Sequence, residues 1–234
     1  MFLFSLLEVS EQATNVVKWI SVGGVVVLFL LILLLGIFSQ KRPDTKQLAF
    51  AGVCVALSFI LAIIKVKPLK DGGSITLASF VPVMLYAFIY GPQSGFIVGL
   101  IHGLLNFIES PYILTPATFV FDYLLAFVGI GVMGFFGKMQ RKEKAVTPLV
   151  LGAVAVFSLR FIFHFCSGTI FFLENSIWVD LPNWALSNAF VYSFIYQLIY
   201  IPADAVIATL ALILLTKTGV VDMLIKRLRK NTKT

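Results

Sequence analysis

Long apolar runs separated by short polar segments dominate this chain. A window of about 19 residues, close to the length at which a helix crosses a bilayer, finds seven such runs. They extend from Val17 to Phe38, Leu48 to Ile64, Ile75 to Tyr90, Ser94 to Ile108, Pro116 to Gly137, Thr147 to Phe172 and Ser187 to Thr216. None has the strict alternation of a barrel strand, and a spanning segment in lipid must pair its own backbone groups. The pattern predicts an all-α integral membrane protein with seven helices, of which the third and fourth are the shortest.

Composition supports this class and excludes a soluble domain. Hydrophobic residues make up 59% of the 234 positions and charged residues only 12%, which leaves too little polar surface for a water-exposed shell. Cys54 and Cys166 both lie inside apolar runs, where a buried free thiol is the expected state. We predict no disulfide, no metal site and no cofactor.

The net charge of +7 lies at the ends of the predicted helices, which argues against a nucleic-acid partner. Three clusters follow the first, fifth and last helices. They comprise Lys41, Arg42 and Lys46; Lys138, Arg141, Lys142 and Lys144; and Lys226, Arg227, Arg229, Lys230 and Lys233. The positive-inside rule places these segments in the cytoplasm. We expect a multi-pass plasma-membrane protein with an outer amino terminus and a cytoplasmic carboxyl terminus, although Lys65, Lys67 and Lys70 would then lie outside.

A polar linker, SQKRPDTKQ, separates the first predicted helix from the others. That helix is too long for a signal-peptide core and has no small-x-small cleavage site after it, so we expect it to be retained. The predicted organisation is an amino-terminal extension with an additional helix (residues 1–40), a six-helix membrane domain (45–220) and a basic cytoplasmic tail (221–234).

Small residues recur at four-residue spacing in two places. Gly91, Gly95, Gly99 and Gly103 line one face of the fourth run, where they indicate close packing inside the bundle. Gly52 and Ala56 repeat the spacing in the second run. There, internal packing and docking onto another membrane protein are both open.

Three ionisable residues, Asp122, Arg160 and His164, interrupt the apolar runs. A charged side chain near mid-membrane costs about 2.5 kcal/mol or more on insertion scales, so it indicates a function or a compensating partner. In the predicted topology Asp122 lies roughly 10 Å below the outer surface. Arg160 lies near the middle of the sixth helix, with His164 one turn above it on the same face.

Polar and aromatic residues of the last helix lie at the same depth. Tyr192, Tyr196 and Gln197 occupy its first three turns. Such a combination is typical of an outward-facing pocket for a small polar ring compound. We expect Asp122 to attract a cationic or amino-bearing ligand, aromatic rings to cover its faces and Gln197 to fix ring nitrogens.

Other roles are open for these buried charges. Asp122 and Arg160 can form an internal pair that only neutralises charge. Asp204 lies deeper in the last helix, behind Pro202, where a kink can open backbone groups. A structural role for Asp204 and a role in ligand binding are both open, and we leave it out of the predicted site.

Four stretches of the chain resemble a known family in order and spacing. They are GGSITLASFVPVMLYAFIYGPQSGFIVGLIHGLLNFI, PYILTPATFVFDYLLAFVGIG, LRFIFHFCSGTIFF and VYSFIYQLIYIP. The D-Y-x-x-A-F and H-F-x-x-G-x-x-F segments are the most specific. The family is that of the thiamine-specific S components (ThiT family) of energy-coupling-factor (ECF) transporters, and the resemblance covers the chain from about Lys46 onward.

This resemblance implies a six-helix substrate-binding subunit without an ATPase of its own. Such subunits work with a transmembrane coupling subunit and two cytoplasmic ATPase subunits, and they deliver cargo by toppling in the membrane. Small residues on the first core helix would contact the coupling subunit, which assigns docking to Gly52 and Ala56.

The resemblance also implies a set of ligand contacts: Asp122, Tyr123, Arg160, His164, Phe172, Tyr192, Gln197 and Tyr112. Several of them depart from the family pattern. Asp122 replaces Glu, Arg160 replaces Lys, Phe172 replaces a stacking Trp and Gln197 replaces Asn. The loop from Lys65 to Ser74 also lacks the Trp that can cover the pocket.

The sequence thus predicts a subunit that captures thiamine or a related pyrimidine compound. The alternative is a self-sufficient proton-coupled carrier that uses Asp122 and His164 as a relay, although such carriers usually show two related halves and this chain shows no convincing repeat. We do not expect an enzyme, because the sequence offers no nucleophile with a nearby partner and no H-E-x-x-H spacing.

Overall fold

The computed structural model describes residues 23, 43–68, 73–112, 116–139, 146–170, 184 and 188–229. The chain divides into two units, Met1–Ser39 and Gln40–Thr234. The predicted first helix, Val17 to Phe38, lies outside the described residues except for Gly23, which is helical. The extension at residues 1–40 therefore stays a prediction.

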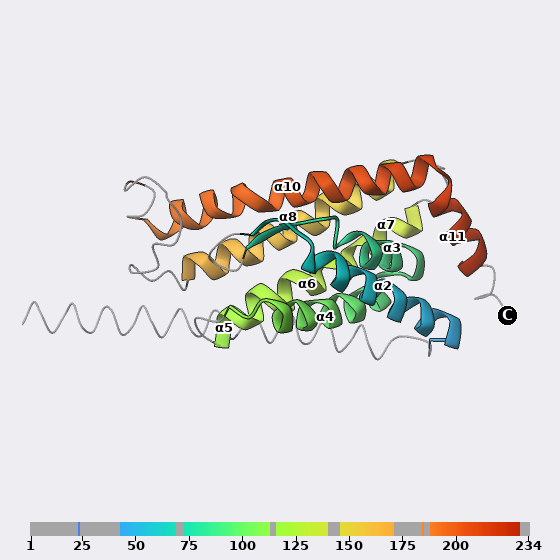
Figure 1. The fold of residues 1–234 in the computed structure, drawn as a ribbon, viewed down its shortest axis with the longest axis horizontal. Coiled ribbons are helices and arrows are strands. Elements are labelled where there is room, and N and C mark those ends of the chain that lie inside the picture. The colour runs from blue at the N-terminus through green and yellow to red at the C-terminus, as the bar shows by residue number, and fades with distance from the viewer. Residues whose placement is uncertain are drawn as a thin grey trace, which may run out of the picture. The chain divides into compact units, whose positions relative to one another are not determined.

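Helices account for nearly all of the described part of the second unit. They are α2 (Thr45–Ile63), α3 (Val81–Tyr90), α4 (Pro92–Glu109), α8 (Thr147–Ile170), α10 (Ala189–Lys217) and α11 (Val220–Arg229), together with a segmented helix over residues 116–139. In the described part, four segments are long and apolar enough to cross a membrane: Thr45–Ile63, Val120–Gly137, Thr147–Thr169 and Ala189–Lys217. The prediction of an all-α integral membrane protein is confirmed. Figure 1 shows α8 and α10 side by side, with α11 turned across the end of the bundle near α3.

The helix starts follow local sequence signals. The Asp44 carboxylate accepts the Gln47 amide hydrogen at 2.6 Å before α2, and the Asn188 side chain accepts the Phe190 amide hydrogen at 2.9 Å before α10. Between α3 and α4, Gly91 has φ +98°, a conformation that a side chain would strain. The Asp44 and Asn188 side chains thus pair amide groups at helix starts that would otherwise lack partners.

A short β-hairpin occupies the predicted loop from Lys65 to Ser74 and extends into the predicted start of the third helix. Strands β1 (Lys65–Pro68) and β2 (Ser74–Thr76) pair antiparallel. The prediction that this helix begins at Ile75 is wrong, because α3 begins at Val81. The backbone amide of Thr76 donates to the Asp204 carboxylate at 3.1 Å and makes no helical hydrogen bond.

The fifth apolar run is also not one regular helix. It comprises α5 (Pro116–Phe119), a π-helical turn η1 (Val120–Leu125), α6 (Ala126–Val128), a 3₁₀ turn η2 (Gly129–Val132) and α7 (Met133–Met139). A π-helical turn widens the backbone and often marks a functional site. Asp122 and Tyr123 lie in this turn.

Close packing of α4 against this segmented helix confirms the role predicted for most of the glycine series. A Cβ atom on Gly103 would collide with the Tyr123 carbonyl, and one on Gly99 with the Phe127 carbonyl. Gly91 differs, since it forms the turn before α4 and nothing lies within 4 Å of its Cβ position.

The segment predicted as a basic tail from residue 221 begins with a helix. Helix α11 contacts α3 and α10, and its Val221 is fully buried in the core. Lys226 and Arg227 are exposed on it.

Candidate solute-binding site

A pocket lies inside the second unit, where η1, α4, α8, α10 and β2 meet. It encloses about 960 Å³ of atom-free space, including the part open to solvent. Seven of the eight predicted ligand contacts line it: Asp122, Tyr123, Arg160, His164, Tyr192, Gln197 and Tyr112. The eighth, Phe172, lies outside the described residues.

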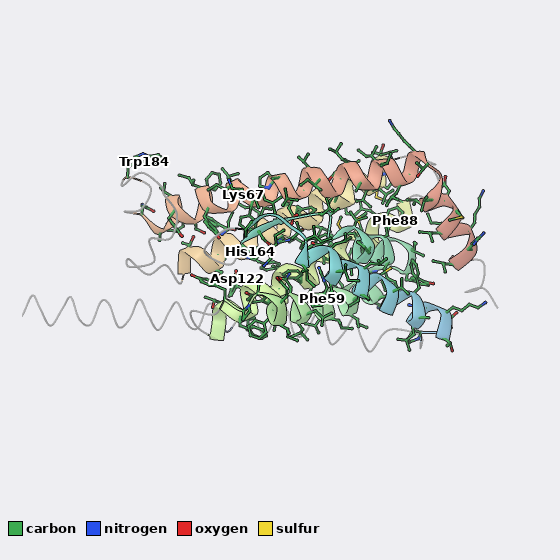
Figure 2. The ribbon with its side chains drawn as sticks, viewed as in Figure 1. Phe59, Lys67, Phe88, Asp122, His164 and Trp184 are labelled. Atoms are coloured by element: carbon green, nitrogen blue, oxygen red, sulfur yellow. The ribbon has the colours of Figure 1, made fainter. Side chains whose placement is uncertain are left out.

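The Asp122 carboxylate is held by two side chains of α8. One oxygen is 2.8 Å from His164 Nδ1, and the other accepts a hydrogen bond from the Ser167 hydroxyl at 2.8 Å. His164 and Ser167 lie three residues apart, so they share one helix face. Figure 2 shows Asp122 and His164 next to each other. This geometry presents a fixed carboxylate to the pocket.

Arg160 has a different carboxylate partner. Its guanidinium donates to Asp204 Oδ2 at 3.3 Å and lies 4.2 Å from the centroid of the Phe80 ring. Since the two acids each have their own partner, the alternative that Asp122 and Arg160 neutralise each other is wrong. The side chains of Arg160 and Asp204 are 9% and 2% exposed, which makes this a buried pair.

Asp204 is not among the predicted site residues. It joins Arg160 to the hairpin, because its Oδ1 also accepts from the Thr76 hydroxyl at 2.9 Å. An acid inside an apolar run was the available signal, the same one that identified Asp122.

Three buried polar atoms at the pocket have no hydrogen-bond partner among the described residues: His164 Nε2, Gln197 Oε1 and Arg160 Nε. With Nδ1 donating to Asp122, the free His164 nitrogen is an acceptor. Unpaired buried polar atoms are costly, so they indicate where a ligand would bond. His164, Gln197 and Arg160 all line the pocket, so its wall offers two acceptors and one donor without partners among the described residues.

Aromatic side chains form much of the remaining wall. Tyr192 and Tyr196 stack with centroids 6.0 Å apart, and Tyr200 meets Tyr196 edge-on at 5.6 Å. The Tyr123 hydroxyl donates to the Ser110 carbonyl at 2.6 Å. Tyr196 was expected at this depth but not among the ligand contacts, and Tyr200 was not expected here, although the four-residue spacing of the three tyrosines on α10 indicated a shared face.

Other pocket residues carried no signal in the sequence. They are small or uncharged polar residues such as Asn106, Thr118, Ser167 and Ser193. Within the described residues, no group of three or more His, Cys, Asp or Glu side chains is placed to hold a metal ion.

A polar, aromatic-lined pocket inside a helical membrane bundle is typical of proteins that bind small solutes within the membrane. The chain belongs to the thiamine transporter protein family (Thia_YuaJ), whose model matches residues 48–221. The family resemblance of the sequence is thereby confirmed.

Two relatives illustrate the match. The chain is 30% identical over 191 residues to the thiamine transporter ThiT of Bacillus subtilis, covering 77% of this chain and 95% of that protein. The solved structure of ThiT from Listeria monocytogenes superposes with a TM-score of 0.62 at 21% identity, covering 74% of this chain and 94% of the other. The latter similarity establishes a shared fold.

Proposed function

We propose that this protein captures thiamine, or a closely related aminopyrimidine compound, in the pocket between η1, α8 and α10. The observation that carries the proposal is the Asp122 carboxylate, fixed by His164 and Ser167 beside a wall of tyrosine rings. A carboxylate and aromatic faces suit a cationic thiazolium ring. The name of the Bacillus subtilis relative supports the same cargo.

The unpaired atoms suit the aminopyrimidine ring. An exocyclic amino group offers donors to His164 Nε2 and Gln197 Oε1, and a ring nitrogen offers an acceptor to Arg160 Nε. Tyr112, Tyr123, Tyr192 and Phe172 would cover the faces of the ligand.

Identification of a ligand retained through purification tests the cargo. The protein is expressed in medium containing thiamine, purified in detergent, and its extract is identified by mass. We expect thiamine or a thiamine precursor in wild-type protein. A different compound, or none after thiamine is added back, contradicts this cargo.

We further propose that the protein is the S component of an ECF importer, with six core helices at residues 45–220 and a cytoplasmic carboxyl terminus. Gly52 and Ala56 are exposed on α2, and a Cβ atom on Gly52 would meet nothing within 4 Å. An accessible small-residue face permits close approach of a partner helix. A transmembrane coupling subunit would dock there and deliver the cargo with two ATPase subunits.

Uptake by reconstituted vesicles tests the need for partners. Radiolabelled thiamine should accumulate with ATP only when the coupling and ATPase subunits are present. Uptake by the purified chain alone, driven by a proton gradient, would instead support the carrier in which Asp122 and His164 relay protons.

A further inference from the structure

Asp204 does not line the pocket, but its carboxylate bonds to two residues that do, Thr76 and Arg160. The residue is 1% exposed. Oδ1 accepts from the Thr76 amide at 3.1 Å and from the Thr76 hydroxyl at 2.9 Å, while Oδ2 accepts from Arg160 at 3.3 Å. The Asp204 carboxylate therefore holds both strand β2 and the Arg160 guanidinium.

The charges of the pocket explain what this arrangement can do. Among its described lining residues, the side chains charged at neutral pH are Asp122 and Arg160. Alone, these two would leave the pocket electrically neutral. With Asp204 compensating Arg160, the negative charge of Asp122 remains to act on a solute. Charges in a buried site interact strongly because the surroundings screen them weakly.

We propose that Asp204 is a specificity-determining residue, which neutralises Arg160 so that the pocket prefers a cation over an anionic analogue. It acts through Arg160 and does not touch the ligand. Its bonds to Thr76 also hold β2, whose residues Ser74 and Thr76 line the pocket, against the same side chain. This inference rests on the proposed function.

Calorimetric titration with thiamine and thiamine monophosphate tests it. Thiamine is a cation, whereas the monophosphate carries net negative charge at neutral pH. In wild-type protein thiamine should bind more tightly. Asp204→Asn should reduce that preference at least about tenfold, the change in a binding constant that 1.4 kcal/mol produces. Asp204→Glu should restore it.

Three variants separate charge from structure. Thr76→Val removes a bond to β2 but no charge, and should weaken both ligands by the same factor. Asp222→Asn makes the same chemical change on α11, which packs on α3 and α10, and should change neither affinity. The double variant Arg160→Gln with Asp204→Asn removes both charges and should regain the wild-type preference. It also avoids the unpaired buried cation that can prevent Asp204→Asn from folding.

The outcomes are distinguishable. Equal weakening of both ligands in Asp204→Asn, or a double variant that fails to regain the preference, overturns the inference. If wild-type protein binds neither ligand, the proposed function itself fails, and the inference fails with it.

Discussion

The Asp122 carboxylate is the best-defined group of the pocket. Each of its oxygens has a partner on α8 at 2.8 Å, so few other orientations of the side chain remain. A charge fixed in advance does not have to be reoriented when a ligand arrives, which improves affinity. The fixed orientation of the Asp122 carboxylate therefore depends on His164 and Ser167.

Ser167→Ala removes one of these two supports. Because a hydrogen bond to a charged group is worth about 1.5 kcal/mol or slightly more, we expect thiamine affinity to fall about tenfold. Calorimetric titration measures the change. Ser158→Ala, at an exposed position of the same helix, is the matched control and should bind like wild type. Equal affinities in the two variants would show that Ser167 does not support the carboxylate.

Individual pocket residues were predictable from the sequence where a polar or charged side chain interrupts an apolar run. Asp122, Arg160 and His164 were found because charge and imidazole are rare in apolar runs. Their pairing was not predictable, since it depends on how each helix is rotated toward its neighbours. The sequence therefore left an Asp122–Arg160 pair open as an alternative, whereas the carboxylate partner of Arg160 is Asp204.

At the level of elements, the small residues of α4 and those of α2 have opposite environments. A Cβ atom on Gly103 would collide with the Tyr123 carbonyl of η1, whereas one on Gly52 meets nothing within 4 Å. The same spacing thus serves packing within the bundle in one helix and leaves an accessible face in the other.

Gly103→Leu should disrupt the pocket by pushing α4 away from η1. Overpacking of a well-packed core typically costs about 1–3 kcal/mol, and here the displaced backbone carries Asp122. We expect a lower Tm in detergent and loss of thiamine binding. Unchanged stability and affinity would contradict the close approach of α4 and η1.

Gly52→Leu should behave in the opposite way. The added side chain has room, so Tm and thiamine affinity should equal those of wild type, while copurification with the coupling subunit should be lost. Val206→Leu, on an exposed face of α10, is the control for a larger apolar side chain. If Gly52→Leu assembles normally, α2 does not dock through this position.

Most elements were predictable from the apolar runs. The long apolar runs identified α2, α8 and α10 to within a few residues, because bilayer thickness sets a clear length. The hairpin was not predicted, because its strands are only four and three residues long. The π-helical turn escaped because nothing in VFDYLL distinguishes it from an ordinary helical turn.

At the scale of the whole molecule, the described pocket lies entirely in the unit Gln40–Thr234. The family model likewise matches residues 48–221. Ligand capture should therefore be a property of this unit. The polar linker around residue 40 predicts an amino-terminal extension separate from the six-helix domain, and that organisation stays a prediction.

Removal of residues 1–39 tests this division of labour. We expect the shortened protein to insert, fold and bind thiamine with wild-type affinity, since every described pocket residue is retained. Fluorescence quenching in detergent gives the affinity. A large loss of binding by folded protein would place part of the site in the first unit.

The most direct test of the central claim compares thiamine binding by wild-type protein and Asp122→Asn. The substitution keeps the size of the side chain and removes its charge. Calorimetry on protein freed of ligand should give a clear binding signal for wild type and an affinity weaker by about 100-fold or more for the variant, as expected when about 2.7 kcal/mol of charge pairing is lost. Equal affinities, or no signal from the wild type, would contradict the account.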